Sequence, residues 1–157
     1  MLINHFLTAI PFLGMQCLAN PSPPVFKSRQ ITDERVHLTD CISQGSQGSV
    51  VVYCKNDSVC NRTPAENDIC VMRADSLFTW EQRNQGCTFQ GTNTRFVWDI
   101  EPNARDAEFA EDDVVGSGSN GFHRFNCTKS DNRILFTDNA KRQCKSIYSC
   151  FNVSCVN

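Results

Sequence analysis

Short runs that alternate between apolar and polar residues recur along most of the chain. The clearest run, RFVWDI at 95–100, places Phe96, Trp98 and Ile100 on one side of an extended backbone and the intervening residues on the other. Such alternation is typical of a strand with one buried face. The same pattern, with enrichment in β-branched and aromatic residues, predicts strands at 48–54, 68–72, 77–82, 95–100, 121–127, 133–138 and 144–151.

Turn-forming stretches such as QGSQG, NRTPAEND and RNQG separate these runs, and GSGSNG is expected to be a flexible loop. Only residues 103–113 are compatible with a short helix, with Asn103 as its N-cap. Many short strands at turn-marked spacing predict an all-β fold. We expect a disulfide-stapled antiparallel β-sandwich or small barrel with at most one short helix, and its aromatic side chains in the core.

The first residues differ from the rest in composition. Residues 1–19 contain no Asp, Glu, Lys or Arg and are mostly apolar. A membrane helix needs about 20 residues, and Pro11 interrupts this stretch. A secretory signal peptide over 1–19 is therefore predicted, with Cys17 and Ala19 as the small residues of its cleavage site.

Two further segments follow. Residues 20–40 begin with NPSPP and continue polar, which predicts a flexible leader or pro-segment. Residues 41–157 form the predicted cysteine-rich β domain. A net charge of −2 argues against nucleic acid or an anionic membrane as a partner. We expect a secreted, extracellular monomer without a membrane anchor.

Nine cysteines remain if Cys17 is removed with the signal peptide. No C-x-x-C pair occurs, which argues against a zinc ribbon or a thioredoxin-like site and favours disulfides. Four disulfides would leave one thiol, and eight cysteines allow about 105 pairings. Cys127 and Cys144 could clip a hairpin, while Cys150 or Cys155 is the candidate for the unpaired thiol. The nine are Cys41, Cys54, Cys60, Cys70, Cys87, Cys127, Cys144, Cys150 and Cys155.

Four Asn-X-Ser/Thr sequences are potential glycosylation sites in a secreted chain. Asn56 and Asn61 lie on either side of Cys60 in a polar segment and are the stronger pair. Asn126 precedes a cysteine in a predicted strand, and Asn152 lies near the end of the chain. For these two, chance explains the pattern equally well.

Candidates for catalysis are few and carry no recognisable motif. His123, Glu81, Glu101 and Arg95 could be combined into a ribonuclease-like site. In such a site a carboxylate or imidazole acts as base and an arginine binds the phosphate. A strand histidine is more often a packed or half-exposed residue. We therefore predict no catalytic site and a protein that is not an enzyme.

Other chemistry is equally sparse. His37 lies in the predicted leader, so a rigid pairing with His123 is not expected. The acidic run at 108–113 does not match the twelve-residue calcium loop. GSGSNG fits neither a nucleophile elbow nor a phosphate-binding loop. No metal and no cofactor are predicted.

An apolar start, a Pro-rich leader and a cysteine-rich β domain that ends in FNCTKSDNRILFTDN…CKSIYSC resemble the small secreted cysteine-rich proteins of filamentous fungi. This resemblance implies an effector- or elicitor-like role outside a host cell. Proteins of this broad class usually act by binding host or wall components rather than by catalysis. The odd number of cysteines departs from the even framework of the class.

The expected function is therefore binding of an unknown host protein or cell-wall component, with an effect on host defence or cell death. Two alternatives remain open. One is a small secreted ribonuclease-like hydrolase that uses His123 with a carboxylate. The other is an antimicrobial toxin.

Overall fold

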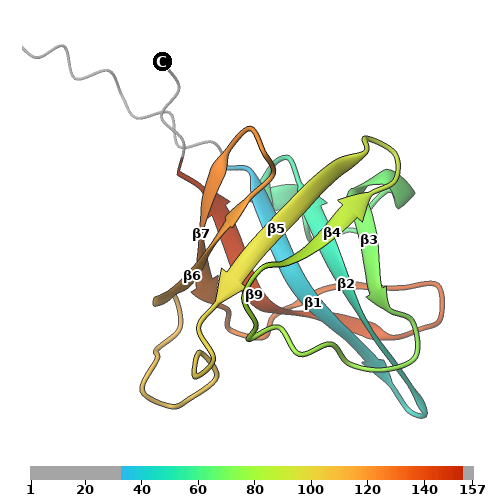
Figure 1. Cartoon of the computed structure of the whole chain (residues 1–157). Helices are drawn as coiled ribbons and strands as arrows, with labels where there is room; N and C mark the ends of the chain where they lie inside the picture. The colour runs from blue at the N-terminus through green and yellow to red at the C-terminus, as the bar shows by residue number, and fades with distance from the viewer. Residues whose placement is uncertain (1–32, 154–157) are drawn as a thin grey trace, which may run out of the picture.

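The computed structural model describes residues 33–153, which form an all-β fold (Figure 1). Single 3-10 turns occur at Asp57–Val59 and Glu66–Asp68. The predicted fold class is confirmed. The strands of this region are β1 Arg35–Ser43, β2 Ser46–Cys54, β3 Ile69–Arg73, β4 Gln85–Phe89, β5 Thr94–Ile100, β6 Val114–Ser119, β7 Arg124–Lys129, β8 Ile134–Thr137 and β9 Gln143–Asn152.

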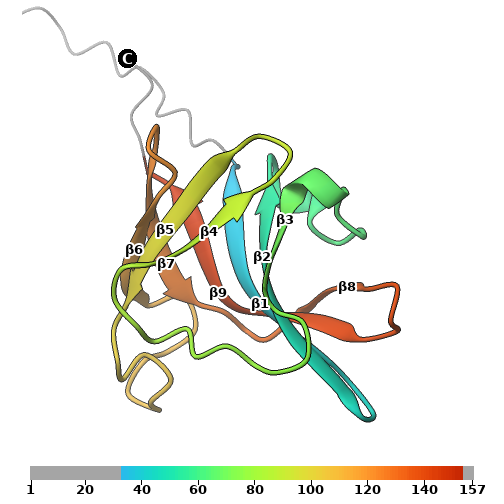
Figure 2. The ribbon, with the colours of Figure 1, turned by 45° about the vertical axis from the view of Figure 1, so that its right-hand side comes forward.

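All strand pairs are antiparallel, and the sheet follows the order β3-β2-β1-β9-β7-β6-β5-β4. The sheet curls until its two end strands, β3 and β4, face each other, as Figures 1 and 2 show. No hydrogen-bonded ladder joins β3 to β4 among the described residues, and the Cys70–Cys87 disulfide links them instead. The result is a nearly closed barrel with a covalent seam.

The barrel interior is filled by the inward face of each strand. On β5, Phe96, Trp98 and Ile100 are buried, as the alternation predicted. The rings of Phe96 and Trp98 stack at 6.1 Å, and Phe125 of β7 meets Phe96 edge-on at 5.3 Å. Such aromatic pairs stabilise a core beyond the area they bury.

A second apolar layer lies outside the barrel wall. Strand β8 pairs with the start of β9 and lies off the main sheet path (Figure 2). Its Leu135 and Phe136 pack with Val50 and Val52 on the outward face of β2. Parts of β1, β2 and β9 are therefore buried on both faces.

The eight cysteines within residues 33–153 form four disulfides: Cys41–Cys144, Cys54–Cys60, Cys70–Cys87 and Cys127–Cys150. The predicted Cys127–Cys144 clip is wrong, because each of these residues faces a partner directly across a neighbouring strand. Cys150 is paired, so it is not the unpaired thiol. The other candidate, Cys155, lies outside the described residues.

The boundary of the predicted flexible leader needs correction. Residues 35–40 belong to β1, which pairs with both β2 and β9. His37, placed in that leader by the sequence, is fully buried. The sequence of β1 alternates between polar and apolar residues only over 35–39, and its polar residues His37, Thr39 and Asp40 are buried as well. The predicted signal peptide and the first part of the leader lie outside the described residues.

Several local expectations also change. Residues 77–82 form a loop rather than a strand, and residues 103–113 form successive turns rather than a helix. β4 and β6 were missed, and β6 includes most of the expected flexible loop GSGSNG. Its glycines allow close approach to β5: a Cβ on Gly116 would lie 2.2 Å from the carbonyl oxygen of Asp99. No helix among the described residues is long and apolar enough to cross a membrane.

Candidate binding site at the open end of the barrel

The two ends of the barrel differ. At one end, the segment between β3 and β4 crosses the opening (Figure 1). Its Trp80 is fully buried and packs against Phe78 and Trp98, with ring centroids 5.0 and 5.7 Å away. The indole Nε1 of Trp80 donates to the buried Asp40 carboxylate at 3.0 Å, and Ser49 Oγ donates to the same oxygen at 2.6 Å. This end is closed.

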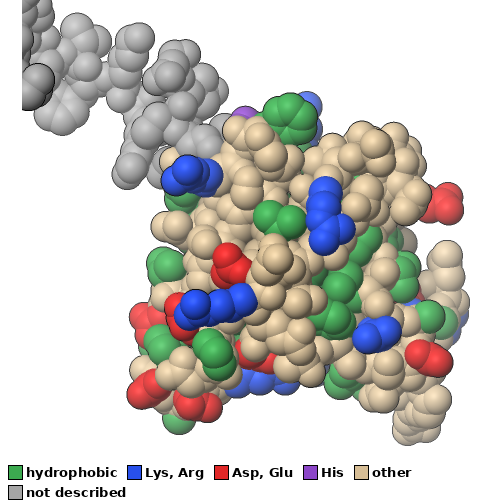
Figure 3. Space-filling model, viewed as in Figure 1, with side chains coloured by type: hydrophobic (Ala, Val, Ile, Leu, Met, Phe, Trp, Pro, Cys, Tyr) green, Lys and Arg blue, Asp and Glu red, His purple; other side chains and the backbone are tan. Residues whose placement is uncertain are grey.

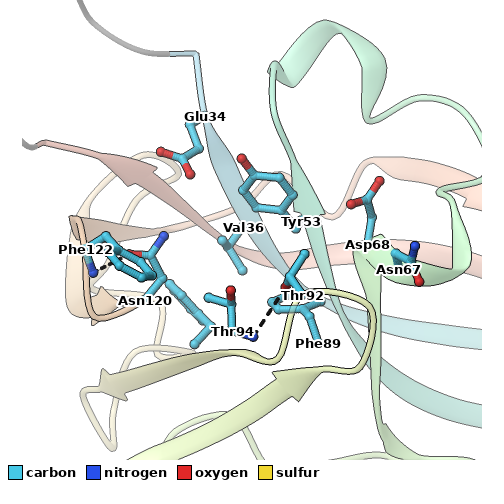
Figure 4. Close-up of a pocket in the computed structure, with 11 residues that line it drawn as sticks. Glu34, Val36, Tyr53, Asn67, Asp68, Phe89, Thr92, Thr94, Asn120 and Phe122 are labelled. Carbon is cyan, nitrogen blue, oxygen red and sulfur yellow. Dashed lines mark hydrogen bonds between the residues drawn. The ribbon is translucent and has the colours of Figure 1, made fainter.

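A cavity of about 190 Å³ opens at the opposite end (Figure 4). Side chains reach it from the start of β1, the end of β2, the turn before β3, the β4–β5 hairpin and the β6–β7 hairpin. The lining residues are Glu34, Val36, Tyr53, Asn67, Asp68, Phe89, Thr92, Thr94, Phe96, Asn120 and Phe122. We call this cavity the open-end pocket.

The inner part of the open-end pocket is apolar and largely aromatic. Val36, Phe89 and Phe96 are buried core residues that also line it. The ring of Tyr53 meets that of Phe89 edge-on at 6.3 Å. Apolar walls with a few converging polar groups are typical of small-molecule sites.

The charged residues of the lining are acidic. The lining contains the carboxylates of Glu34 and Asp68, and among the described lining residues there is no Lys, Arg or His. Elsewhere, the face drawn in Figure 3 carries basic and acidic side chains side by side. The lining of the open-end pocket therefore offers acidic but no basic side chains.

Glu34 is held by a small hydrogen-bonded network. Its Oε2 lies 3.0 Å from His123 Nδ1 and 2.5 Å from Asn152 Nδ2. Burial, together with the Glu34 carboxylate that accepts its hydrogen bond, raises the pKa of Tyr53 to about 12. Tyr53 therefore stays a neutral donor. The network fixes one carboxylate at the mouth of the pocket, and its side chain is only 11% exposed.

The β6–β7 hairpin places an exposed aromatic ring at the mouth. Asn120 Oδ1 accepts hydrogen bonds from the backbone N–H groups of Phe122 and His123, at 3.0 and 2.7 Å. Gly121 has φ +85°, a conformation that favours glycine. This tight turn holds Phe122 at the pocket, where the residue is 82% exposed (Figure 4).

The structure does not bring the predicted catalytic candidates together. His123 contacts Glu34, not Glu81 or Glu101. Glu81 belongs to the closed end, where its Oε1 accepts from Arg105 Nε at 2.5 Å and from the hydroxyl of Tyr148 at 2.6 Å.

The other two candidates, Glu101 and Arg95, do not line the open-end pocket. Glu101 is exposed and lies 4.0 Å from Arg83. Arg95 is exposed on the outward face of β5. Sequence reasoning missed Glu34 because it fell in the predicted leader, and it missed Tyr53 and Asp68 because only the barrel topology brings their strand ends together.

His37 serves the outer layer. Its Nδ1 lies 2.9 Å from Ser146 Oγ and its Nε2 lies 3.3 Å from Asp57 Oδ1. Burial lowers the pKa of His37, and the hydrogen bond with His37 is the main cause that lowers the pKa of Asp57 to about 2. Arg133 also binds Asp57, at 2.6 Å. This network, which joins the buried His37 to the partly exposed Asp57 and Arg133, is structural.

Two buried groups in the described region have metal-ligand residue types at short range: His37 with Cys54 and Cys60, and Asp138 with Cys41 and Cys144. Each contains both cysteines of a disulfide. Cysteine binds a metal as a thiolate. Because the cysteines of both groups are in disulfides, neither group offers three metal ligands.

The four glycosylation candidates differ in exposure. Asn56 and Asn61 are exposed, whereas Asn126 is half-buried in β7 beside the Cys127–Cys150 disulfide. Asn152 is buried, and its Nδ2, the atom that would carry a glycan, donates to Glu34. A glycan at Asn152 would therefore require this side chain to leave its buried position.

No known protein family, curated protein or solved structure matches this chain.

Proposed function

We propose that this chain is a secreted, non-enzymatic, effector- or elicitor-like protein whose open-end pocket binds a small component of the host or of a cell wall. The observation that carries the proposal is the difference between the barrel ends. One end is closed by Trp80 and its network, and the other holds a cavity with aromatic walls and converging polar groups. Barrel mouths are frequent ligand sites.

Secretion is supported by the covalent framework. Four disulfides within residues 33–153 indicate an oxidising compartment. The predicted signal peptide would deliver the chain to such a compartment. Disulfides also stabilise the folded state of a secreted domain, because they restrict the unfolded chain.

Binding is favoured over phosphodiester cleavage by the charge of the pocket. A ribonuclease must hold a phosphate, which requires cationic or N–H donors at the reacting group. The open-end pocket instead carries Glu34 and Asp68, and Arg95 faces outward on β5. The close contact of His123 with Glu34 is the one feature that favours a hydrolase.

A pocket-filling variant tests the proposal. Thr94 lines the open-end pocket, so Thr94→Phe should occupy the cavity. Thr88, on the outward face of the same hairpin, supplies the matched control Thr88→Phe. The purified, disulfide-intact proteins are infiltrated into plant leaf tissue, and the oxidative burst and cell death are measured.

The proposal expects the wild type and Thr88→Phe to change the host response, and Thr94→Phe to lose that effect. Thr94→Phe with full activity would contradict the pocket as the site of action. Loss of activity in His123→Ala would favour the hydrolase only if the wild type also cleaves RNA. Incubation of the same proteins with RNA at several pH values checks that alternative directly, because only a ribonuclease gives cleavage that His123→Ala removes.

A further inference from the structure

The open-end pocket combines aromatic faces with carboxylates. Tyr53, Phe89 and Phe96 line its inner part, and Phe122 stands at its mouth. Aromatic faces carry a negative potential that attracts a cation lying over the ring. Aromatic residues arranged around a small cavity are the common way in which proteins bind an ammonium group.

The carboxylates add net negative charge to the same place. Glu34 is contacted by His123 and Asn152. Asp68 has no ion-pair partner within the described residues. A carboxylate without an ion-pair partner attracts a bound cation more strongly beside apolar walls than in full contact with water, because the walls reduce screening by water.

The size of the cavity limits the ligand. About 190 Å³ is below the range of roughly 300–1,000 Å³ that is usual for drug-sized molecules. The pocket therefore fits a compact molecule, or one ring of a larger molecule whose remainder contacts Phe122 at the exposed mouth.

We propose that the open-end pocket binds a small organic cation: a protonated amine on an apolar, preferably aromatic, body. The apolar body lies against Val36, Phe89 and Phe96, and the ammonium group lies between the aromatic faces and the carboxylate of Asp68. The inference rests on the proposed function in taking this pocket as the binding end, and it adds the chemical class of the ligand.

Three probes that share one ring and differ in charge test the proposal. The disulfide-intact protein is titrated with 2-phenylethylamine, 2-phenylethanol and phenylacetate by NMR chemical-shift mapping and calorimetry. The amine is expected to bind most tightly, the alcohol more weakly, and phenylacetate not measurably. Binding of the amine should weaken as salt is raised, because the attraction is partly electrostatic.

Matched carboxamide variants locate the charge. Asp68→Asn keeps the shape of the side chain and is expected to weaken binding of the amine about three- to tenfold, with binding of the alcohol unchanged. Asp75→Asn, at an exposed carboxylate outside the pocket, should leave both affinities unchanged. The NMR spectrum of each variant verifies its fold.

Equal affinity for the amine and the alcohol, or an Asp68→Asn variant that binds the amine as the wild type does, would overturn the inference. No binding of the amine would do the same. The proposed function has a separate readout, because a host response lost in Thr94→Phe but present in Thr88→Phe would support it even if all three probes failed to bind.

Discussion

The closed and open ends of this barrel are built from the same strands but serve different purposes. β1 runs between them: Val36 lines the open-end pocket, and Asp40 accepts the hydrogen bonds that hold Trp80 across the closed end. At the closed end Trp80 is fully buried, whereas the open end leaves Phe122 exposed beside a cavity. Polar groups inside a barrel can therefore either hold a plug in place or remain available to a ligand.

The largest effect is expected from removal of the Trp80 indole, which closes one end of the barrel. Trp80→Ala should destabilise the fold by about 3–5 kcal/mol, because it removes a fully buried indole and leaves a cavity. Phe122→Ala, at the exposed mouth of the other end, should change stability by no more than about 0.5 kcal/mol. Chemical denaturation of both variants measures the difference. Similar losses in the two variants would show that the ends are not distinct.

The second-largest effect is expected from removal of the Cys70–Cys87 disulfide, which forms the covalent seam between β3 and β4. Replacing Cys70 and Cys87 with alanine should cost about 3 kcal/mol, since the two residues are 17 apart in sequence. The pocket should also lose its affinity for 2-phenylethylamine, because Asp68 and Phe89 approach it from the two sides of the seam. Denaturation and titration measure the two effects.

The Cys54–Cys60 disulfide provides the control for the seam. It closes a loop of six residues outside the barrel wall, so its removal should cost about 2 kcal/mol. Binding of the amine should then be unaffected. If both double variants bind the amine normally, the seam is not needed to hold the pocket.

The sequence predicted the fold class because several strands bury one face only. RFVWDI alternates, and its Phe96, Trp98 and Ile100 all point inward. Most of β1 was assigned to the leader because its alternation is short and its buried face toward the outer layer carries the polar residues His37 and Thr39. β6 was taken for a loop because VVGSGS has small residues where close packing against β5 requires them.

The candidate site was far less predictable than the fold. Each residue of the open-end pocket is ordinary in its local sequence, and no spacing relates Glu34, Tyr53, Asp68 and Asn120. They meet because four chain segments end at the same rim of a barrel. His123 lies beside a carboxylate, but that carboxylate is Glu34 rather than Glu81 or Glu101.

The buried carboxylate of the closed end predicts a dependence on pH. Burial raises the pKa of Asp40 above its usual value of 3.8, against the lowering effect of hydrogen bonds from Ser49 and Trp80. Between 3.8 and the raised pKa, the unfolded state binds fewer protons than the folded state, so stability falls as pH rises. In that range Asp40→Asn, which keeps an oxygen acceptor, should lose less stability than the wild type.

Denaturation at a series of pH values measures this difference. Asp68→Asn at the open end is the control, because this carboxylate lies outside the hydrogen-bonded group of Asp40, Ser49 and Trp80. A wild-type curve parallel to that of Asp40→Asn would mean that Asp40 titrates in the folded state as it does in the unfolded chain.

The smallest effect concerns the two tyrosines of the chain, one at each end. Tyr53 is hydrogen-bonded to Glu34 at the open end, and Tyr148 donates to Glu81 at the closed end. Burial is the main cause that raises both pKa values, to about 12 for Tyr53 and higher still for Tyr148. Stability should therefore fall as pH rises from 10 towards 12, because the unfolded tyrosines ionise first.

Alkaline titration followed by phenolate absorbance should show no component near pH 10 in the folded protein, and Tyr53→Phe should remove the earlier of the two transitions. A transition near pH 10 in the folded wild type that Tyr53→Phe removes would mean that the Tyr53–Glu34 contact, and with it the fixed carboxylate at the mouth, is not maintained in solution.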